Sequence, residues 1–124
     1  MDNLTFEKSK NTLGVNFDAS SGILVLAGSS FPENASDFFD PIIKWIQNYM
    51  LEVTGKVTLN FHFDYLNSSS IKYVSDIIEK MELYGKSGGE VTINWYYDEN
   101  DEDILEMGED LKSDVSLQFN LIMN

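Results

Sequence analysis

Three consecutive hydroxyl side chains, Ser68, Ser69 and Ser70, follow Asn67 at the point where an alternating apolar segment changes to helical spacing. Asparagine and serine are favoured at helix N-termini because their side chains accept hydrogen bonds from free backbone N–H groups. Capping requires one such residue, and this stretch offers four. A hydroxyl here can also be phosphorylated, since the N–H groups and dipole of a helix N-terminus tolerate an anion. The spacing alone leaves both roles open, a helix cap and a phosphorylatable turn.

The acidic segment 98–110 is the second candidate site, with eight carboxylates and no lysine. Asp98, Asn100 and Glu102 have a spacing loosely similar to that of a calcium-binding loop. However, Asp103 stands where such a loop needs glycine for its sharp turn. Apolar residues at helical spacing also run through the segment, which favours a solvated helix. A docking face for a basic partner is the other interpretation.

Residues typical of catalytic centres are scarce. The chain has no cysteine and a single histidine, His62, and it lacks the Gly-rich, nucleophile-elbow and HExxH motifs. His62 stands between Phe61 and Phe63 in an alternating segment, so we expect it on the sheet face opposite those rings. Carboxylates are too numerous to select an acid–base pair. The sequence therefore predicts a protein that is not an enzyme and has no cofactor or metal, with carboxylate-based catalysis or calcium binding as the alternative.

Charge restricts the choice of partners. The 124 residues include 21 acidic residues, eight lysines and no arginine, for a net charge of −13. Such a chain repels phosphate backbones and anionic membranes, and it lacks the residue that most often clamps phosphates. We therefore expect no nucleic acid, no membrane and no small-molecule substrate. The absence of cysteine, of a signal peptide and of a long apolar run predicts a cytoplasmic protein.

The elements that must position these residues follow from apolar periodicity. A short strand begins at Leu4, and two β-rich runs flank a turn at residues 19–22, which predicts a hairpin. The main helix is expected from about Asp40, with Pro41 in its first turn and a preliminary turn before it. The further expected elements are strands at 57–65, 91–95 and 117–123 and helices at 70–85 and 104–111. This order predicts one α/β domain over residues 1–124, a mixed β-sheet opened by an N-terminal hairpin and packed with about three helices.

Aromatic residues at the ends of two expected strands are candidates for docking. Tyr65 ends one strand and Tyr97 the next, and the ends of neighbouring parallel strands lie at one edge of a sheet. Tyr96 is out of phase with Tyr97, so it must face the other side. The predicted partner-binding residues are Tyr65, Asn67, Ser69 and Tyr97.

Several of these stretches together resemble the SiaC family of bacterial regulatory phosphoproteins. The resemblance covers nearly the whole chain from Ile23 onward. The matching stretches, in chain order, are Ser30-Phe31-Pro32-Glu33-Asn34-Ala35, Phe38-Phe39, Pro41, Trp45, Tyr49, Leu59-Asn60-Phe61, Tyr65-Leu66-Asn67-Ser68-Ser69-Ser70-Ile71-Lys72, Asn94-Trp95-Tyr96-Tyr97-Asp98 and Gly108-Glu109-Asp110.

The resemblance implies a STAS-like fold, related to anti-sigma-factor antagonists, and a role in partner switching. It implies that a protein kinase phosphorylates the domain and that a phosphatase reverses this. It also implies that the unphosphorylated form binds and activates an output protein, a diguanylate cyclase, in cyclic di-GMP and biofilm regulation. The family's phosphoacceptor position is Ser68 here, where relatives often carry Thr, with Ser69 and Ser70 as alternatives. The competing hypothesis is a constitutive protein-binding adaptor of the same fold, whose serines only cap a helix.

Overall fold

The computed structural model describes all 124 residues, which form six β-strands and three α-helices. In chain order the elements are β1 (Leu4–Phe6), β2 (Gly14–Asp18), β3 (Ile23–Ser30), α1 (Ala35–Glu52), β4 (Val57–Leu66), α2 (Ser68–Lys86), β5 (Val91–Tyr97), α3 (Glu102–Ser113) and β6 (Gln118–Met123). None of the helices is both long and apolar enough to cross a bilayer.

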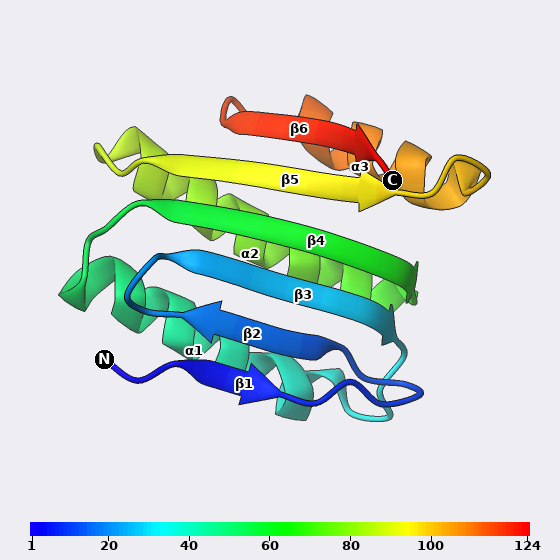
Figure 1. Cartoon of the computed structure of the whole chain (residues 1–124), viewed down its shortest axis with the longest axis horizontal. Helices are drawn as coiled ribbons and strands as arrows, with labels where there is room; N and C mark the ends of the chain where they lie inside the picture. Colours follow the sequence, from blue (N-terminus) through cyan, green and yellow to red (C-terminus); the bar gives the residue numbers. More distant parts are fainter.

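The six strands form one mixed sheet in the order β1-β2-β3-β4-β5-β6. β1, β2 and β3 pair antiparallel, and β3, β4, β5 and β6 pair parallel. Each parallel connection contains one helix, and all three helices lie on the same face of the sheet (Figure 1). The predicted α/β fold, with a mixed sheet opened by an N-terminal hairpin, is confirmed.

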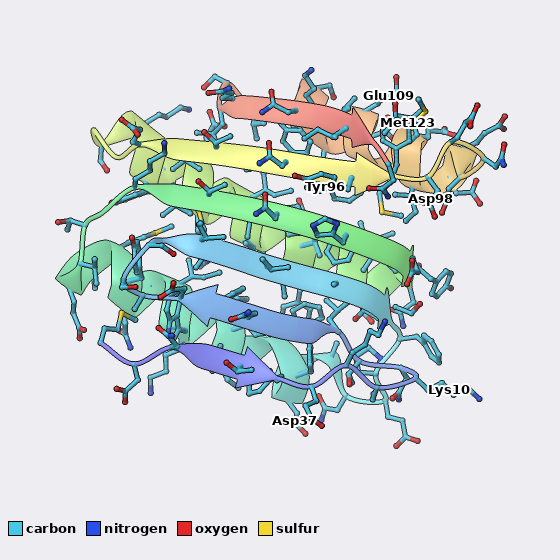
Figure 2. The ribbon with its side chains drawn as sticks, viewed as in Figure 1. Lys10, Asp37, Tyr96, Asp98, Glu109 and Met123 are labelled. Carbon is cyan, nitrogen blue, oxygen red and sulfur yellow. The ribbon has the colours of Figure 1, made fainter.

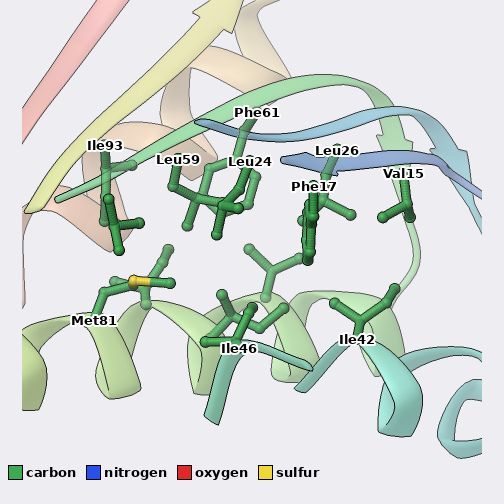
Figure 3. Close-up of a cluster of buried hydrophobic side chains, with 14 of the residues drawn as sticks. Val15, Phe17, Leu24, Leu26, Ile42, Ile46, Leu59, Phe61, Met81 and Ile93 are labelled. Carbon is green, nitrogen blue, oxygen red and sulfur yellow. The ribbon is translucent and has the colours of Figure 1, made fainter. Parts of the chain in front are cut away.

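The core lies between the sheet and the helices. Alternate strand residues such as Phe17, Leu26 and Phe61 point from the sheet toward Ile46 of α1 and Met81 of α2, and all five are essentially inaccessible to solvent (Figure 3). Full burial of one such side chain stabilises the fold by about 1.5–3 kcal/mol. Period-2 alternation in the strands and period-3.6 spacing in the helices thus produce one continuous core.

α1 begins earlier than the sequence predicted. The helix starts at Ala35 rather than near Asp40, because the side chain of Asn34 caps it by accepting a hydrogen bond from the Asp37 N–H at 3.3 Å. Pro41 therefore lies inside the helix, not in its first turn. The predicted preliminary turn is part of a single continuous helix.

β4 contains an irregularity that changes which residues face outward. Gly28 of β3 pairs with Phe63, whereas the next residue, Ser29, pairs with Tyr65, so Asp64 is bulged out of the ladder. Strict alternation would place Tyr65 on the core face with Phe63, and the bulge breaks the alternation at this last step. Leu66 turns into the core in its place, and Tyr65 is 53% exposed.

The second face of the sheet carries no helix and includes several polar side chains. His62 and Tyr96 stack there with ring centroids 4.1 Å apart, and Tyr96 projects from the face that carries no helix (Figure 2). Beside them, Asn94 donates to Asn60 at 2.9 Å and accepts from Asn120 at 3.0 Å, so a ladder of amides links β4, β5 and β6. The predicted outward orientation of His62 and Tyr96 is confirmed.

Candidate phosphorylation and docking site

The N-terminus of α2 is fixed to the end of β3 by a set of short hydrogen bonds. The Asn67 side chain accepts from the Ser70 N–H at 3.0 Å and so caps the helix. The Asn67 N–H donates to the Ser30 carbonyl at 3.0 Å. The Ser70 hydroxyl lies 2.7 Å from that of Ser30 and 3.1 Å from the Ser30 carbonyl oxygen. The turn therefore has one defined geometry, set by a strand far away in the sequence.

The three consecutive serines differ in their accessibility. Ser70 is completely buried, and its hydroxyl is engaged with Ser30. Ser69 is exposed, but its hydroxyl donates to the capping oxygen of Asn67 at 3.1 Å. Ser68 is exposed, and its hydroxyl has no hydrogen-bond partner within the protein. Of the three, only Ser68 combines an exposed side chain with a hydroxyl that makes no hydrogen bond within the protein.

Charges around Ser68 are mixed. The first turn of α2 carries no acidic residue, and the N–H groups there give the helix end a partial positive charge. Lys72 follows Ser68 by four residues and is exposed, so both lie on the same side of the helix. Asp64, Asp101 and Asp103 line a hollow that also includes Tyr65 and Leu66, the residues shortly before this turn. Within α2, the helix end and Lys72 are the groups that would offset an anion on Ser68.

An exposed aromatic pair lies beside the cap. Phe31, the first residue after β3, is 39% exposed, and its ring meets that of Tyr65 edge to face with centroids 6.0 Å apart. The backbone bond from Asn67 to Ser30 holds both rings next to the start of α2. The sequence indicated Tyr65 but not Phe31 as a docking residue. The sequence does contain a signal for Phe31: it is an aromatic residue just after the second β-rich run, and Pro32 follows it.

Tyr97 is less closely associated with this edge. Phe61 pairs with Trp95, and β5 ends two residues later, whereas β4 continues to Leu66. Tyr65 therefore lies beyond the end of β5. Tyr97 is half-buried against the core, and its carbonyl accepts from the Asn124 N–H at 2.9 Å. Trp95 is fully buried and belongs to the core.

The acidic segment folds as a capped helix. Asp101 caps α3 by accepting from the Ile104 N–H at 3.1 Å, and Glu102 and Asp103 occupy the first turn, where carboxylates suit the helix dipole. Since Glu102 and the residues after it are helical, they do not form a calcium-binding loop. No group of three acidic or histidine side chains is close enough together to hold a metal ion.

His62 is separate from the site. Its ring stacks on Tyr96 on the face that carries no helix, and desolvation there lowers its pKa below the ordinary value of 6.5. No carboxylate or hydroxyl side chain hydrogen-bonds to it, so it has none of the partners that a catalytic histidine needs. Its observed contact is the stack with the Tyr96 ring.

The structure is a small α/β domain with a mixed sheet and an exposed helix N-terminus beside exposed aromatic rings. Residues 6–124 match the sequence model of the family described as "SiaC family regulatory phosphoprotein". The chain belongs to the SiaC family.

Individual relatives agree with this assignment. An uncharacterised protein of Pseudomonas aeruginosa strain UCBPP-PA14 is 30% identical over 119 residues, which cover 96% of this chain and 94% of the relative. The structure of SiaC of Pseudomonas aeruginosa is similar with a TM-score of 0.94 at 28% identity, over all of both chains. A third relative is SiaC in the crystal structure of diguanylate cyclase SiaD with its activator SiaC from the same organism. Its TM-score is 0.94 at 29% identity, over 98% of this chain and 99% of that chain.

Proposed function

We propose that this protein is a non-catalytic switch that binds and activates a diguanylate cyclase while Ser68 carries no phosphate. A protein kinase of the same system phosphorylates Ser68 and releases the cyclase, and a phosphatase restores the active form. The reactions take place in the cytoplasm, where ATP supplies the phosphate. Membership of a family of regulatory phosphoproteins supports the phosphorylation, and the Pseudomonas SiaC–SiaD complex supports the choice of output.

The observation that carries the proposal is the difference between the three serines. Ser68 is exposed and its hydroxyl is free, whereas Ser69 supports the cap and Ser70 is buried. A kinase reaches Ser68 without opening the fold. Capping does not account for Ser68 either, because Asn67 is the cap. This weakens the alternative of a constitutive adaptor whose serines only stabilise the helix.

A phosphate on Ser68 changes binding more than folding. The modification adds about −1.5 to −2 charges. The N-terminus of α2 and the exposed Lys72 offset part of that charge within the domain, by roughly 0.3–1 kcal/mol for the helix dipole. A partner that covers Phe31 and Tyr65 must remove water from the dianion, and a penalty of only about 3–4 kcal/mol weakens binding by hundreds-fold. The phosphate can therefore release a partner while the domain stays folded.

Binding of purified cyclase to Ser68 variants, measured by titration calorimetry, tests this proposal. We expect Ser68→Ala to bind as the wild type does, and Ser68→Asp to bind at least about tenfold more weakly, since one added charge imitates part of a phosphate. Ser36→Asp is the matched control. Ser36 lies in the first turn of α1 as Ser68 lies in that of α2, so the control adds the same charge at a different helix N-terminus. Equal binding by Ser68→Ala and Ser68→Asp would refute the switch.

A further inference from the structure

A groove runs between α2 and α3, and we propose that it binds a basic amphipathic helix of a partner protein. Two hollows of about 350 and 330 Å³ share Leu111 and together form this α2–α3 groove. Its floor contains apolar residues from both helices and from the start of the following loop, and the second hollow is the more polar of the two. These residues are Ile71, Ile78, Met107, Leu111 and Val115.

The rim of the groove is strongly acidic. α3 contributes Asp103, Glu106 and Asp110, Asp114 follows at its end, and α2 contributes Glu79 on the opposite side. No lysine is among the residues that line the two hollows. An apolar floor between acidic walls is complementary to a helix with apolar residues on one side and Lys or Arg along its flanks.

The groove is held open by the packing of α3 on the sheet. Gly108 lets α3 approach Trp95, because a Cβ atom at that position would lie 2.5 Å from the indole ring. The Trp95 Nε1–H donates to the Ile104 carbonyl at 2.9 Å. At the far end, Glu82 of α2 accepts from the backbone N–H and hydroxyl of Ser116, with the hydroxyl at 2.6 Å, and so fixes the loop after α3. A groove that is already formed binds a ligand with a smaller loss of conformational entropy than one whose side chains must first become ordered.

The dimensions fit a helix rather than an extended strand. α3 has 12 residues and is about 18 Å long at 1.5 Å per residue. The two hollows extend over most of this length. They are lined by side chains of helices and of the following loop, so they offer no strand edge with which an extended peptide could pair. Three to four turns of a helix, with apolar residues at positions i, i+3 or i+4, and i+7, would cover the floor.

Other occupants are disfavoured by charge. A second copy of this chain brings a net charge of −13 to an already acidic rim. An anionic lipid surface is repelled for the same reason. All 124 residues have a place in the structure, and none of them fills the groove.

The groove differs from the switch in its expected response to phosphate. Ser68 precedes Ile71 by three residues on α2, so the two lie on the same side of that helix, about one turn apart. The hollow at Tyr65 shares Asp103 and Met107 with the first hollow and so extends the groove. A phosphate on Ser68 adds negative charge, which attracts a basic helix. Docking in the groove is therefore expected to survive phosphorylation, and this inference does not depend on the release of a cyclase from Phe31 and Tyr65.

Fluorescence anisotropy with a designed peptide tests the groove. The probe is an 18-residue helical peptide with leucines on one face and lysines on the flanks; a scrambled peptide of the same composition lacks the apolar face. The groove variant is Asp103→Asn/Glu106→Gln/Asp110→Asn. The control variant, Asp37→Asn/Asp40→Asn/Glu52→Gln, loses the same charge from α1. Asp37 lies in a first helical turn, as Asp103 does, and Asp37 and Glu109 mark opposite margins of the molecule (Figure 2).

We expect the groove variant to bind the amphipathic peptide about tenfold more weakly and the control variant to change less than about twofold. Amide NMR signals of Ile71, Met107 and Leu111 should shift on titration, and Ser68→Asp should bind at least as tightly as the wild type. Equal losses in the two variants, or equal binding of the scrambled peptide, would show non-specific charge attraction and overturn the proposal. A loss of peptide binding in Ser68→Asp would also overturn it, whereas a failure of the cyclase experiment would leave it intact.

Discussion

The hydroxyl groups of Ser30 and Ser70 lie 2.7 Å apart and are both inaccessible to solvent, although 40 residues separate them in the sequence. One closes the end of β3 and the other lies in the first turn of α2. The Ser70 hydroxyl also lies 3.1 Å from the Ser30 carbonyl oxygen. This contact fixes the position of the turn that presents Ser68.

Removal of one of these hydroxyls should destabilise the domain. Ser70→Ala leaves the Ser30 hydroxyl buried without its side-chain partner, and an unsatisfied buried group costs about 1–3 kcal/mol. Urea unfolding should show this loss, while Ser69→Ala, on the exposed side of the same turn, should cost under about 0.5 kcal/mol. The double variant Ser30→Ala/Ser70→Ala should lose less than the two single losses added together. Strictly additive losses would mean that the two hydroxyls do not interact.

The pKa of His62 predicts a specific dependence of stability on pH. Desolvation beside Tyr96 lowers this pKa in the folded state, so the unfolded chain takes up the proton first as the pH falls. The contribution of neutral His62 to the free energy of unfolding is therefore fully present above the unfolded pKa of 6.5. It is lost as the pH falls from that value through the lower pKa of the folded state. The free energy of unfolding should be level near neutral pH and should decrease below about pH 6.5.

The matched variant for this effect is His62→Gln, which keeps a polar side chain on the same strand. It should remove the decrease at mildly acid pH, because His62 is the only histidine. Hydrogen bonds lower the pKa of Asp18 below 3.8 and that of Glu82 below 4.5. These carboxylates therefore change stability only at lower pH than His62 does. If the slope below about pH 6.5 were the same in the variant, the effect would not come from His62.

The exposed aromatic pair should contribute to binding and little to stability. We expect Phe31→Ala and Tyr65→Ala each to weaken cyclase binding by about tenfold, since aromatic residues dominate the energy of most protein interfaces. The free energy of unfolding should change by less than about 1 kcal/mol in each, because both rings are largely exposed. Leu83→Ala, which truncates a 62% exposed side chain on the far end of α2, is the control. If Leu83→Ala weakened binding as much as Tyr65→Ala, the assignment of Phe31 and Tyr65 to the cyclase-binding surface would be wrong.

Much of the fold could be predicted because periodicity is a local property. The hairpin of β2 and β3, the three later strands and the helices α2 and α3 lie within a few residues of their expected positions. The sequence places the start of α1 too late, because Pro41 is typical of a first helical turn. Asn34 is a weaker sequence signal than Pro41, yet its side chain accepts a hydrogen bond from the Asp37 N–H and so sets the start of the helix at Ala35.

The site was only partly predictable, because its details depend on contacts distant in sequence. The stretch from Asn67 to Ser70 pointed to a helix start, but the burial of Ser70 depends on Ser30 in another strand. The exposure of Tyr65 depends on the bulge at Asp64, which simple alternation cannot reveal. Phosphorylation itself stays a prediction, supported by the free hydroxyl of Ser68 and by family membership.

The most direct test of the central proposal is phosphopeptide mass spectrometry on the protein isolated from its native cells in the presence of a phosphatase inhibitor. Trypsin should release residues 57–72 as one peptide that contains Ser68, Ser69 and Ser70, since no lysine or arginine interrupts it before Lys72. Fragmentation then assigns the phosphate to one serine. The account predicts phosphate on Ser68. Phosphate on buried Ser70, or an unmodified peptide under all growth conditions, would contradict it.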